Sequence, residues 1–217
     1  MIRNIYTILL NVPAALIALS VHEFAHGFVS TKLGDPTPRA QGRLTLNPLA
    51  HLDPVGALLM VLTGFGWARP VQINPSYYKD RTKGMALTAF AGPLSNLVLA
   101  FVGMFIGIFT GLVLARFGVS GNIVNIVFTF TSVFARLNLS FMVFNLLPFP
   151  PLDGFKIFGP IMTKPVYYAI LRYEHYIMYL LMFLSILGVF SAVIGNGVTF
   201  FYNIILNSVL NIFGLFI

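Results

Sequence analysis

Two histidines and a glutamate stand close together in an apolar stretch near the start of the chain. The stretch covers residues 4–31 and contains His22, Glu23 and His26. Histidines four positions apart lie one turn above each other on one face of an α-helix, so both rings can reach the same zinc ion. The glutamate after the first histidine is placed to take a proton from a zinc-bound water. The spacing therefore predicts a hydrolytic site with one zinc ion as cofactor.

The position of this motif inside a membrane-length segment adds weight to the prediction. An ionisable side chain costs a few kcal/mol at the centre of a bilayer, so such residues usually mark function. The alternative is structural, because histidines also form hydrogen bonds between packed membrane helices. Partner motifs further along the chain favour the catalytic interpretation.

The composition is that of a membrane protein. Of the 217 residues, 58% are hydrophobic and 9% are charged, whereas soluble domains carry about 25% charged residues. Thirteen basic and six acidic residues give a net charge of +7, which favours loops facing anionic lipid over a nucleic-acid partner. Without cysteine, a metal must be held by His, Asp or Glu. The first apolar segment is too long for a signal peptide and is expected to be retained.

Apolar runs long enough to span a bilayer recur along the chain. They predict an all-α polytopic membrane protein with about five spanning helices, at 4–31, 84–115, 122–147, 175–194 and 198–217. The shorter run at 54–65 is expected to be re-entrant or a short membrane segment. The patterns at 41–46 and 70–74 are compatible with short β-strands that would offer an edge to an extended substrate. Residues 1–155 would form the catalytic membrane core, and 156–217 a loop and two apolar helices of the same domain.

Loop charges predict the orientation in the membrane. If segment 54–65 returns to its starting side, ten basic residues share one face and only Arg3 and Arg116 lie opposite; if it crosses, the division is four against eight. The ten are Lys32, Arg39, Arg43, Arg69, Lys79, Arg81, Lys83, Lys156, Lys164 and Arg172. The positive-inside rule favours the first arrangement, with the histidine end of the first helix toward the cytoplasm. Arg136 falls within span 122–147 and is expected to snorkel or to face a wet cavity.

The zinc site needs a third protein ligand, and the chain has few candidates. Asp153 follows a helix that must end at Pro148, and it lies on the same predicted side as His26. It is the favoured ligand, with His51 second; a loop cap or polar contact is the simpler role for His51. The other acids are predicted to be solvated in charged loops or to compensate a helix dipole: Asp35, Asp80 and Glu174.

Three motifs together resemble the signature elements of the site-2 protease family, zinc metalloproteases that cut transmembrane helices within the membrane. They are His22-Glu23-Phe24-Ala25-His26, Gly92-Pro93-Leu94-Ser95-Asn96, and the segment from Asn145 to Leu152-Asp153-Gly154. The resemblance runs in order through most of the first 155 residues. It is to the compact bacterial or archaeal members, because no segment would encode a PDZ or CBS domain, and it implies a multi-pass protein of the plasma membrane.

The resemblance also implies roles for individual residues in regulated intramembrane proteolysis. It implies zinc ligands at His22, His26 and Asp153, a catalytic base at Glu23, and substrate or oxyanion contacts at Asn96 and Asn145. Two imidazoles and one carboxylate leave a fourth zinc position open, as catalytic sites require. The two asparagines have a competing role as hydrogen-bonding links between helices.

Two other functions remain as alternatives. One is a different membrane-embedded zinc peptidase, processing signal peptides or prenylated proteins, which would not need the Leu152-Asp153-Gly154 element. The other is a non-catalytic membrane protein that binds a metal. In each protease interpretation the partners are membrane lipid and transmembrane proteins or peptides, and the oligomeric state stays open.

Overall fold

The computed structural model describes residues 5–63 and 66–214. Within these ranges the regular elements are helices, and no strand is present. Four helices are long and apolar enough to cross a membrane: α1 (Ile5–Lys32), α5 (Arg81–Arg116), α6 (Gly121–Asn145) and α10 (Ser191–Ile212). The predicted all-α polytopic membrane fold is confirmed.

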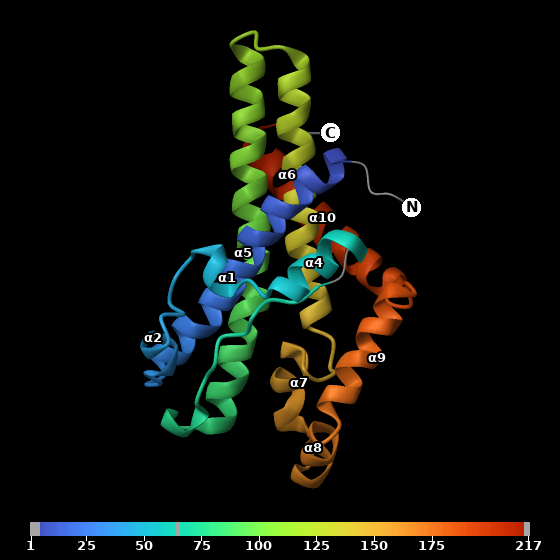
Figure 1. Cartoon of the computed structure of the whole chain (residues 1–217). Helices are drawn as coiled ribbons and strands as arrows, with labels where there is room; N and C mark the ends of the chain where they lie inside the picture. The colour runs from blue at the N-terminus through green and yellow to red at the C-terminus, as the bar shows by residue number, and fades with distance from the viewer. Residues whose placement is uncertain (1–4, 64–65, 215–217) are drawn as a thin grey trace.

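The other helices are shorter and connect or flank these four. They are α2 (Thr37–Ala40), α3 (Pro48–His51), α4 (Pro54–Thr63), α7 (Asp153–Phe158), α8 (Lys164–Leu171) and α9 (Glu174–Ile186), with 3₁₀ turns η1 (Pro75–Tyr77) and η2 (Gly159–Ile161). In Figure 1, α5 and α6 stand as a long antiparallel hairpin that α1 crosses obliquely, and α7, α8 and α9 lie toward the foot of α6.

The α5–α6 pair packs unusually closely because α5 carries glycine every fourth residue. Gly103, Gly107 and Gly111 face α6, and an added Cβ would collide there with Phe134, Thr131 and Phe128 in that order. Small residues let membrane helices approach until their backbones nearly touch. The buried core continues onto α10; it comprises Ala100, Met104, Ile108, Ala135, Leu139, Met142, Val198, Tyr202, Ile205 and Val209.

The fourth predicted span is shorter than expected. α9 has 13 residues and is therefore about 20 Å long, against about 30 Å of hydrocarbon in a bilayer. It ends because Gly188 adopts a left-handed conformation with φ 76°. The N–H groups of Gly188 and Val189 then bond back into the last turn, which closes the helix. The described residues thus contain four helices of spanning length, not five.

Segment 54–65 does not cross the molecule. α4 is only about 15 Å long by helix rise, and the two chain ends that flank it are joined: Leu52 and Ala68 form an antiparallel bridge, and the Arg69 N–H donates to the His51 carbonyl at 2.8 Å. The chain therefore leaves and returns at one place, as a re-entrant segment does. Residues 64–65 lie outside the described residues.

The two predicted strands are not formed. Residues 41–46 and 70–74 have turn or extended backbone without a ladder. Two of the amides that a ladder would use instead bond to side chains: the Val71 N–H donates to Glu23 and the Asn74 N–H donates to Asp35. The alternation of apolar and polar residues therefore reflects contacts with α1 and its following turn, not a sheet.

Arg136, in the middle of α6, finds its partner on α10. Its guanidinium lies 4.0 Å from the centre of the Tyr202 ring, and the Tyr202 hydroxyl is 3.0 Å from Oγ of Ser132. A cation over an aromatic face is stabilised by the negative face of the ring. The exposed arginine therefore stacks between helices, an arrangement not anticipated from the sequence.

Candidate metal centre and active site

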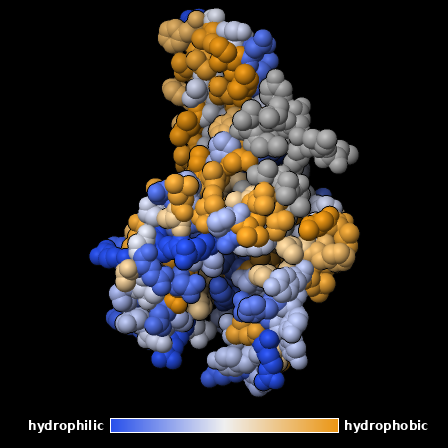
Figure 2. Space-filling view, viewed as in Figure 1, coloured by the Kyte–Doolittle hydropathy of each residue, from blue (hydrophilic) through white to orange (hydrophobic). Residues whose placement is uncertain are grey.

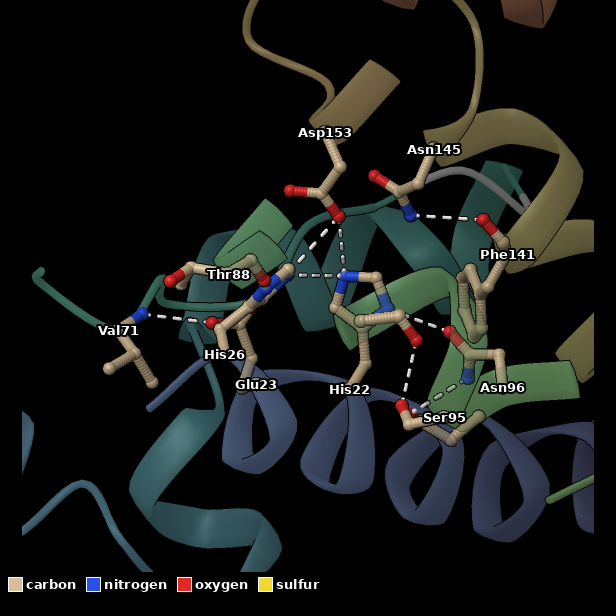
Figure 3. Close-up of polar contacts among 12 residues, drawn as sticks. His22, Glu23, His26, Val71, Thr88, Ser95, Asn96, Phe141, Asn145 and Asp153 are labelled. Carbon is tan, nitrogen blue, oxygen red and sulfur yellow. Dashed lines mark hydrogen bonds and ion pairs between the residues drawn. The ribbon is translucent and has the colours of Figure 1, made fainter. Parts of the chain in front are cut away.

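Three potential metal ligands converge where α1 meets α7. Nε2 of His22 and Nε2 of His26 each lie 3.1 Å from Oδ2 of Asp153, and the two nitrogens are 3.0 Å apart. Figure 3 shows the three side chains pointing at one another from these two helices. Among the described residues, these three form a group whose ligand atoms all lie within 4.8 Å of one another. The predicted third ligand thus reaches the two histidines.

Hydrogen bonds from the far side of each ring determine which nitrogen carries the proton. Nδ1 of His26 lies 2.7 Å from the Thr88 carbonyl, which can only accept, so Nδ1 is the protonated nitrogen of the neutral ring. Nδ1 of His22 lies 2.7 Å from Oδ1 of Asn96 and is likewise a donor. Both Nε2 atoms then present lone pairs to the Asp153 carboxylate. Three acceptors at 3 Å repel unless a cation or proton lies among them, so the donor set fits zinc.

The end of α6 and the proline-rich turn after it position Asp153 beside the two histidines. α6 ends at Asn145, and α7 starts at Asp153. The next residue, Gly154, packs against the end of α6: an added Cβ would collide with the carbonyl oxygens of Leu146 and Leu147. The Asp153 side chain is buried, and its Oδ2 atom faces both Nε2 atoms, so the carboxylate is in position to act as a ligand.

One face of α5 supports both histidines. Thr88, Gly92 and Asn96 are four residues apart, which places them on one side of the helix. Thr88 and Asn96 hold the two rings by hydrogen bonds, and Gly92 lies between them: its added Cβ would stand 2.5 Å from Nε2 of His26 and 2.6 Å from Cε1 of His22. Only glycine leaves room for both rings. The four-residue spacing was visible in the sequence, but its partners on α1 were not.

The side-chain amide of Asn96 forms hydrogen bonds with both its oxygen and its nitrogen. It is completely buried, and its amide nitrogen donates to the Ala18 carbonyl at 3.2 Å and to Oδ1 of Asn138 at 3.0 Å. In this geometry neither amide hydrogen is available for the oxyanion that the sequence suggested. Its side-chain oxygen contacts Nδ1 of His22, on the side of the ring away from the metal group.

Asn145 lies beside Asp153 at the end of α6 (Figure 3). It is half-buried, and its amide nitrogen donates to the Phe141 carbonyl at 3.0 Å. A primary amide has two hydrogens, and for the second no partner is found in the part of the chain that the structure describes. Asn145 therefore retains a donor next to the metal group, unlike Asn96.

Glu23 does not join the metal ligands. Its Oε2 accepts a hydrogen bond of 2.8 Å from the backbone N–H of Val71, in the extended segment after the re-entrant turn. Gly27, one turn further along α1, lies against the same segment, since a Cβ added there would stand 3.4 Å from Cγ1 of Val71. This orienting amide could not be found from residue types, since any residue supplies a backbone N–H.

His51 and Asp53 form hydrogen bonds within the loop and the helix cap that precede α4. Nε2 of His51 lies 2.8 Å from the Thr45 carbonyl, and this histidine is absent from the metal group found among the described residues. Oδ1 of Asp53 accepts from the Gly56 N–H at 2.8 Å and thereby caps α4. His51 is thus a buried residue at the end of α3 whose ring contacts the preceding loop.

Asp35 was predicted to be solvated, and this prediction was wrong. The residue is fully buried and accepts hydrogen bonds from Oγ of Ser30 at 2.7 Å and from the N–H groups of Thr37 and Asn74 at 2.9 and 2.7 Å. Burial raises the pKa of the Asp35 carboxyl, and these hydrogen bonds outweigh the effect and lower its pKa overall. Asp35 thus ties the end of α1 to the segment that carries Val71.

A chain of hydroxyl groups links this anchor to the site. Oγ of Ser30 lies 2.8 Å from the Tyr78 hydroxyl, which lies 3.1 Å from Oγ1 of Thr88. Thr88 is the residue whose carbonyl holds His26. The loop around Tyr78 therefore packs against the same two helices that position the metal ligands.

Comparison with known proteins identifies the family of the chain. The family model for peptidase family M50 matches residues 110–188, which contain Asn145 and Asp153. The protein named "Putative zinc metalloprotease YwhC" from Bacillus subtilis (strain 168) is 40% identical over 179 residues, covering 80% of this chain and 79% of that protein. The chain therefore belongs to peptidase family M50, the site-2 proteases, and is a membrane zinc metalloprotease.

More distant relatives are longer. "Putative zinc metalloprotease Rip2" from Mycolicibacterium smegmatis is 30% identical over 158 residues, covering 70% of this chain and 57% of its own length. Rip2 from Mycobacterium tuberculosis H37Rv is 29% identical over 150 residues, covering 67% and 54%. No solved structure matches the chain.

Proposed function

We propose that this protein hydrolyses peptide bonds within transmembrane segments of membrane-anchored substrates, as a step of regulated intramembrane proteolysis. The observation that carries the proposal is the depth of the metal group. His22 lies about 15 Å from the Lys32 end of α1 by helix rise, near the middle of the apolar stretch Leu10–Lys32. A hydrolytic site at that depth is suited to peptide bonds that lie in the membrane themselves.

In this proposal His22, His26 and Asp153 hold the zinc ion. Zinc bound there supplies a water molecule that ionises near neutral pH. Glu23 accepts the proton of the attacking water, and the Val71 amide on Oε2 leaves Oε1 for this transfer. Glu23 then returns the proton to the nitrogen of the leaving amine. Asn145 donates its remaining amide hydrogen to the oxyanion, and Asn96 and Thr88 keep the two imidazoles oriented.

The substrate must be unwound before it is cut. Every amide inside an α-helix is hydrogen-bonded and shielded by its neighbours, so the bond that reacts has to adopt an extended conformation. We therefore expect substrates to carry helix-weakening Gly, Pro or Asn residues near the cut. Replacing them with Leu should slow cleavage; rates unchanged across several such replacements would count against this.

The proposal is tested by co-expressing the protein with a panel of single-span reporter proteins. The wild type should cut at least one reporter within its membrane segment, and Glu23→Gln should cut none while still binding zinc, because Glu23 is a base and not a ligand. Cleavage that persists in Glu23→Gln would refute the assignment. A protein that binds zinc and cuts no reporter would favour the non-catalytic alternative.

A further inference from the structure

A basic cleft lies directly beside the segment that orients Glu23. It has a volume of about 370 Å³ and is lined by Gln41, Arg43, Arg69, Pro70 and Gln72. This is within the range of about 300–1,000 Å³ that is usual for ligand sites. Pro70 and Gln72 are the neighbours of Val71, whose N–H donates to Glu23. The cleft is therefore lined in part by the two residues adjacent in sequence to the one that contacts the proposed catalytic base.

The cleft carries two positive charges without a matching acid. No acidic residue lines it, and the ion pair that joins a lysine or arginine to a carboxylate in the described residues is Lys83 with Asp80, elsewhere. Arg43 is half-buried and contacts the Ala50 carbonyl, whereas Arg69 is exposed and its backbone N–H is held by His51. The Arg43 guanidinium is thus held by the backbone, and for the Arg69 guanidinium no hydrogen bond or ion pair is found among the described residues. Glutamine amides on both sides add neutral donors.

We propose that this cleft binds an acidic side chain of the substrate, in the flank that follows the membrane segment being cut. The inference rests on the proposed function, because it assigns the ligand by its nearness to Glu23. Guanidinium groups bind carboxylates through short, paired hydrogen bonds. Residues 69–72 lie beside Glu23 through the Val71 contact, so a substrate that extends along this segment would bring its next side chains to the cleft. Figure 2 places the hydrophilic surface on the lower part of the molecule, below the apolar upper shaft of α5 and α6.

The same charges would exclude ordinary membrane proteins. On the cytoplasmic side of a membrane, the flanks of spanning helices are rich in Lys and Arg. Two arginines in the cleft repel such flanks, and a carboxylate relieves that repulsion, so the cleft selects by both attraction and rejection. The substrate class is therefore a single-span protein with Asp or Glu close after its membrane segment.

The experiment measures binding by zinc-loaded Glu23→Gln protein in nanodiscs of phosphatidylcholine. The probe is a labelled single-span peptide that carries Glu, Gln or Lys at each of three flank positions. At one position, Glu should bind about tenfold more tightly than Gln, and Lys more weakly still. The preference should shrink as salt is raised.

Variants of the two arginines assign the preference to the cleft. Arg69→Gln should reduce it severalfold, Arg43→Gln with Arg69→Gln should remove it, and Arg69→Glu should shift it toward the Lys peptide. Lys79→Gln, which removes an exposed charge outside the cleft, is the matched control and should keep it. Equal binding of the Glu and Gln peptides, or a preference that survives loss of both arginines, overturns the proposal, as does failure of every peptide to bind.

A second experiment tests whether the cleft binds the substrate or a lipid headgroup. Adding an anionic phospholipid to the nanodiscs should leave the Glu preference in place; if it abolishes the preference only in protein with both arginines, the cleft is a lipid headgroup site and the proposal is wrong. Because binding is measured without cleavage, a wild-type protein that binds with this preference but cuts none of the peptides refutes the proposed function and leaves the cleft assignment standing.

Discussion

A Cβ atom on Gly92 would lie 2.5 Å from Nε2 of His26. Gly92→Ala should therefore displace a ring whose nitrogen is a proposed metal ligand, and an error of about 1 Å in an active site can reduce the rate by about 100-fold. We expect weaker zinc binding and a large loss of cleavage in a protein that still folds. Zinc is measured by competition with a chelator and folding by thermal unfolding.

Gly195→Ala is the matched control for this variant. It makes the same change inside α10, where an added Cβ meets nothing within 4 Å, and it should leave zinc affinity and cleavage unchanged. A Gly92→Ala protein with normal zinc affinity would show that the histidines do not need this gap.

Removal of the Asn96 side chain should weaken the metal site through His22. Asn96→Leu deletes the acceptor at 2.7 Å from Nδ1, so the ring loses its preferred tautomer and orientation. Partners of metal-bound histidines typically contribute about 10–100-fold to metal affinity. Asn138→Leu is the control, because Asn138 touches Asn96 and not a ligand. Similar losses of zinc affinity in both variants would point to general packing instead.

Loss of Asp153 should remove zinc and activity together. Asp153→Ala deletes the carboxylate 3.1 Å from both ligand nitrogens, whereas Asp53→Ala should retain zinc because Asp53 caps α4. His51→Ala should also retain zinc. The zinc content of each variant is measured after gel filtration. If zinc remains bound in Asp153→Ala but is lost in His51→Ala, the ligand assignment is reversed.

Features of the site that depend on local sequence could be predicted, whereas contacts between distant segments could not. The spacing of His22 and His26 and the proline stop before Asp153 are local, so the triad was predictable. The partners Val71 and Thr88 were not, because they contribute backbone groups that every residue possesses. Asp35 looked solvated because it lies among charged residues, and only the folded chain brings the Asn74 amide onto it. The length of α9 was overestimated because hydropathy continues across the left-handed turn at Gly188.

The buried carboxylate of Asp35 predicts an acid-sensitive anchor. Its pKa is lower in the folded protein than in the unfolded chain, so the stabilisation is fully present above the ordinary aspartate value of about 4 and is lost as pH falls through the folded value. Asp35→Asn should reduce the free energy of unfolding at pH 7 by about 1–3 kcal/mol. The loss of stability as pH falls below about 5 should then be smaller in this variant than in the wild type. Thermal unfolding across this range is the measurement. Asp80→Asn, at an exposed helix cap, is the control, and an unchanged acid profile in Asp35→Asn would contradict the assignment.

The spanning length of α5 predicts that the loops before and after it lie on opposite sides of the membrane. Ser76 lies after the re-entrant segment and Ser120 lies beyond the far end of α5, and both are exposed. Because α5 is the single spanning helix between them, Ser76→Cys and Ser120→Cys should react with an impermeant thiol reagent from opposite sides of sealed vesicles. The chain has no cysteine, so each label reports one position. The excess of basic residues further predicts that Ser76 is cytoplasmic. Labelling of both positions from the same side would exclude this topology, and labelling of Ser76 from outside would reverse the orientation while preserving the fold.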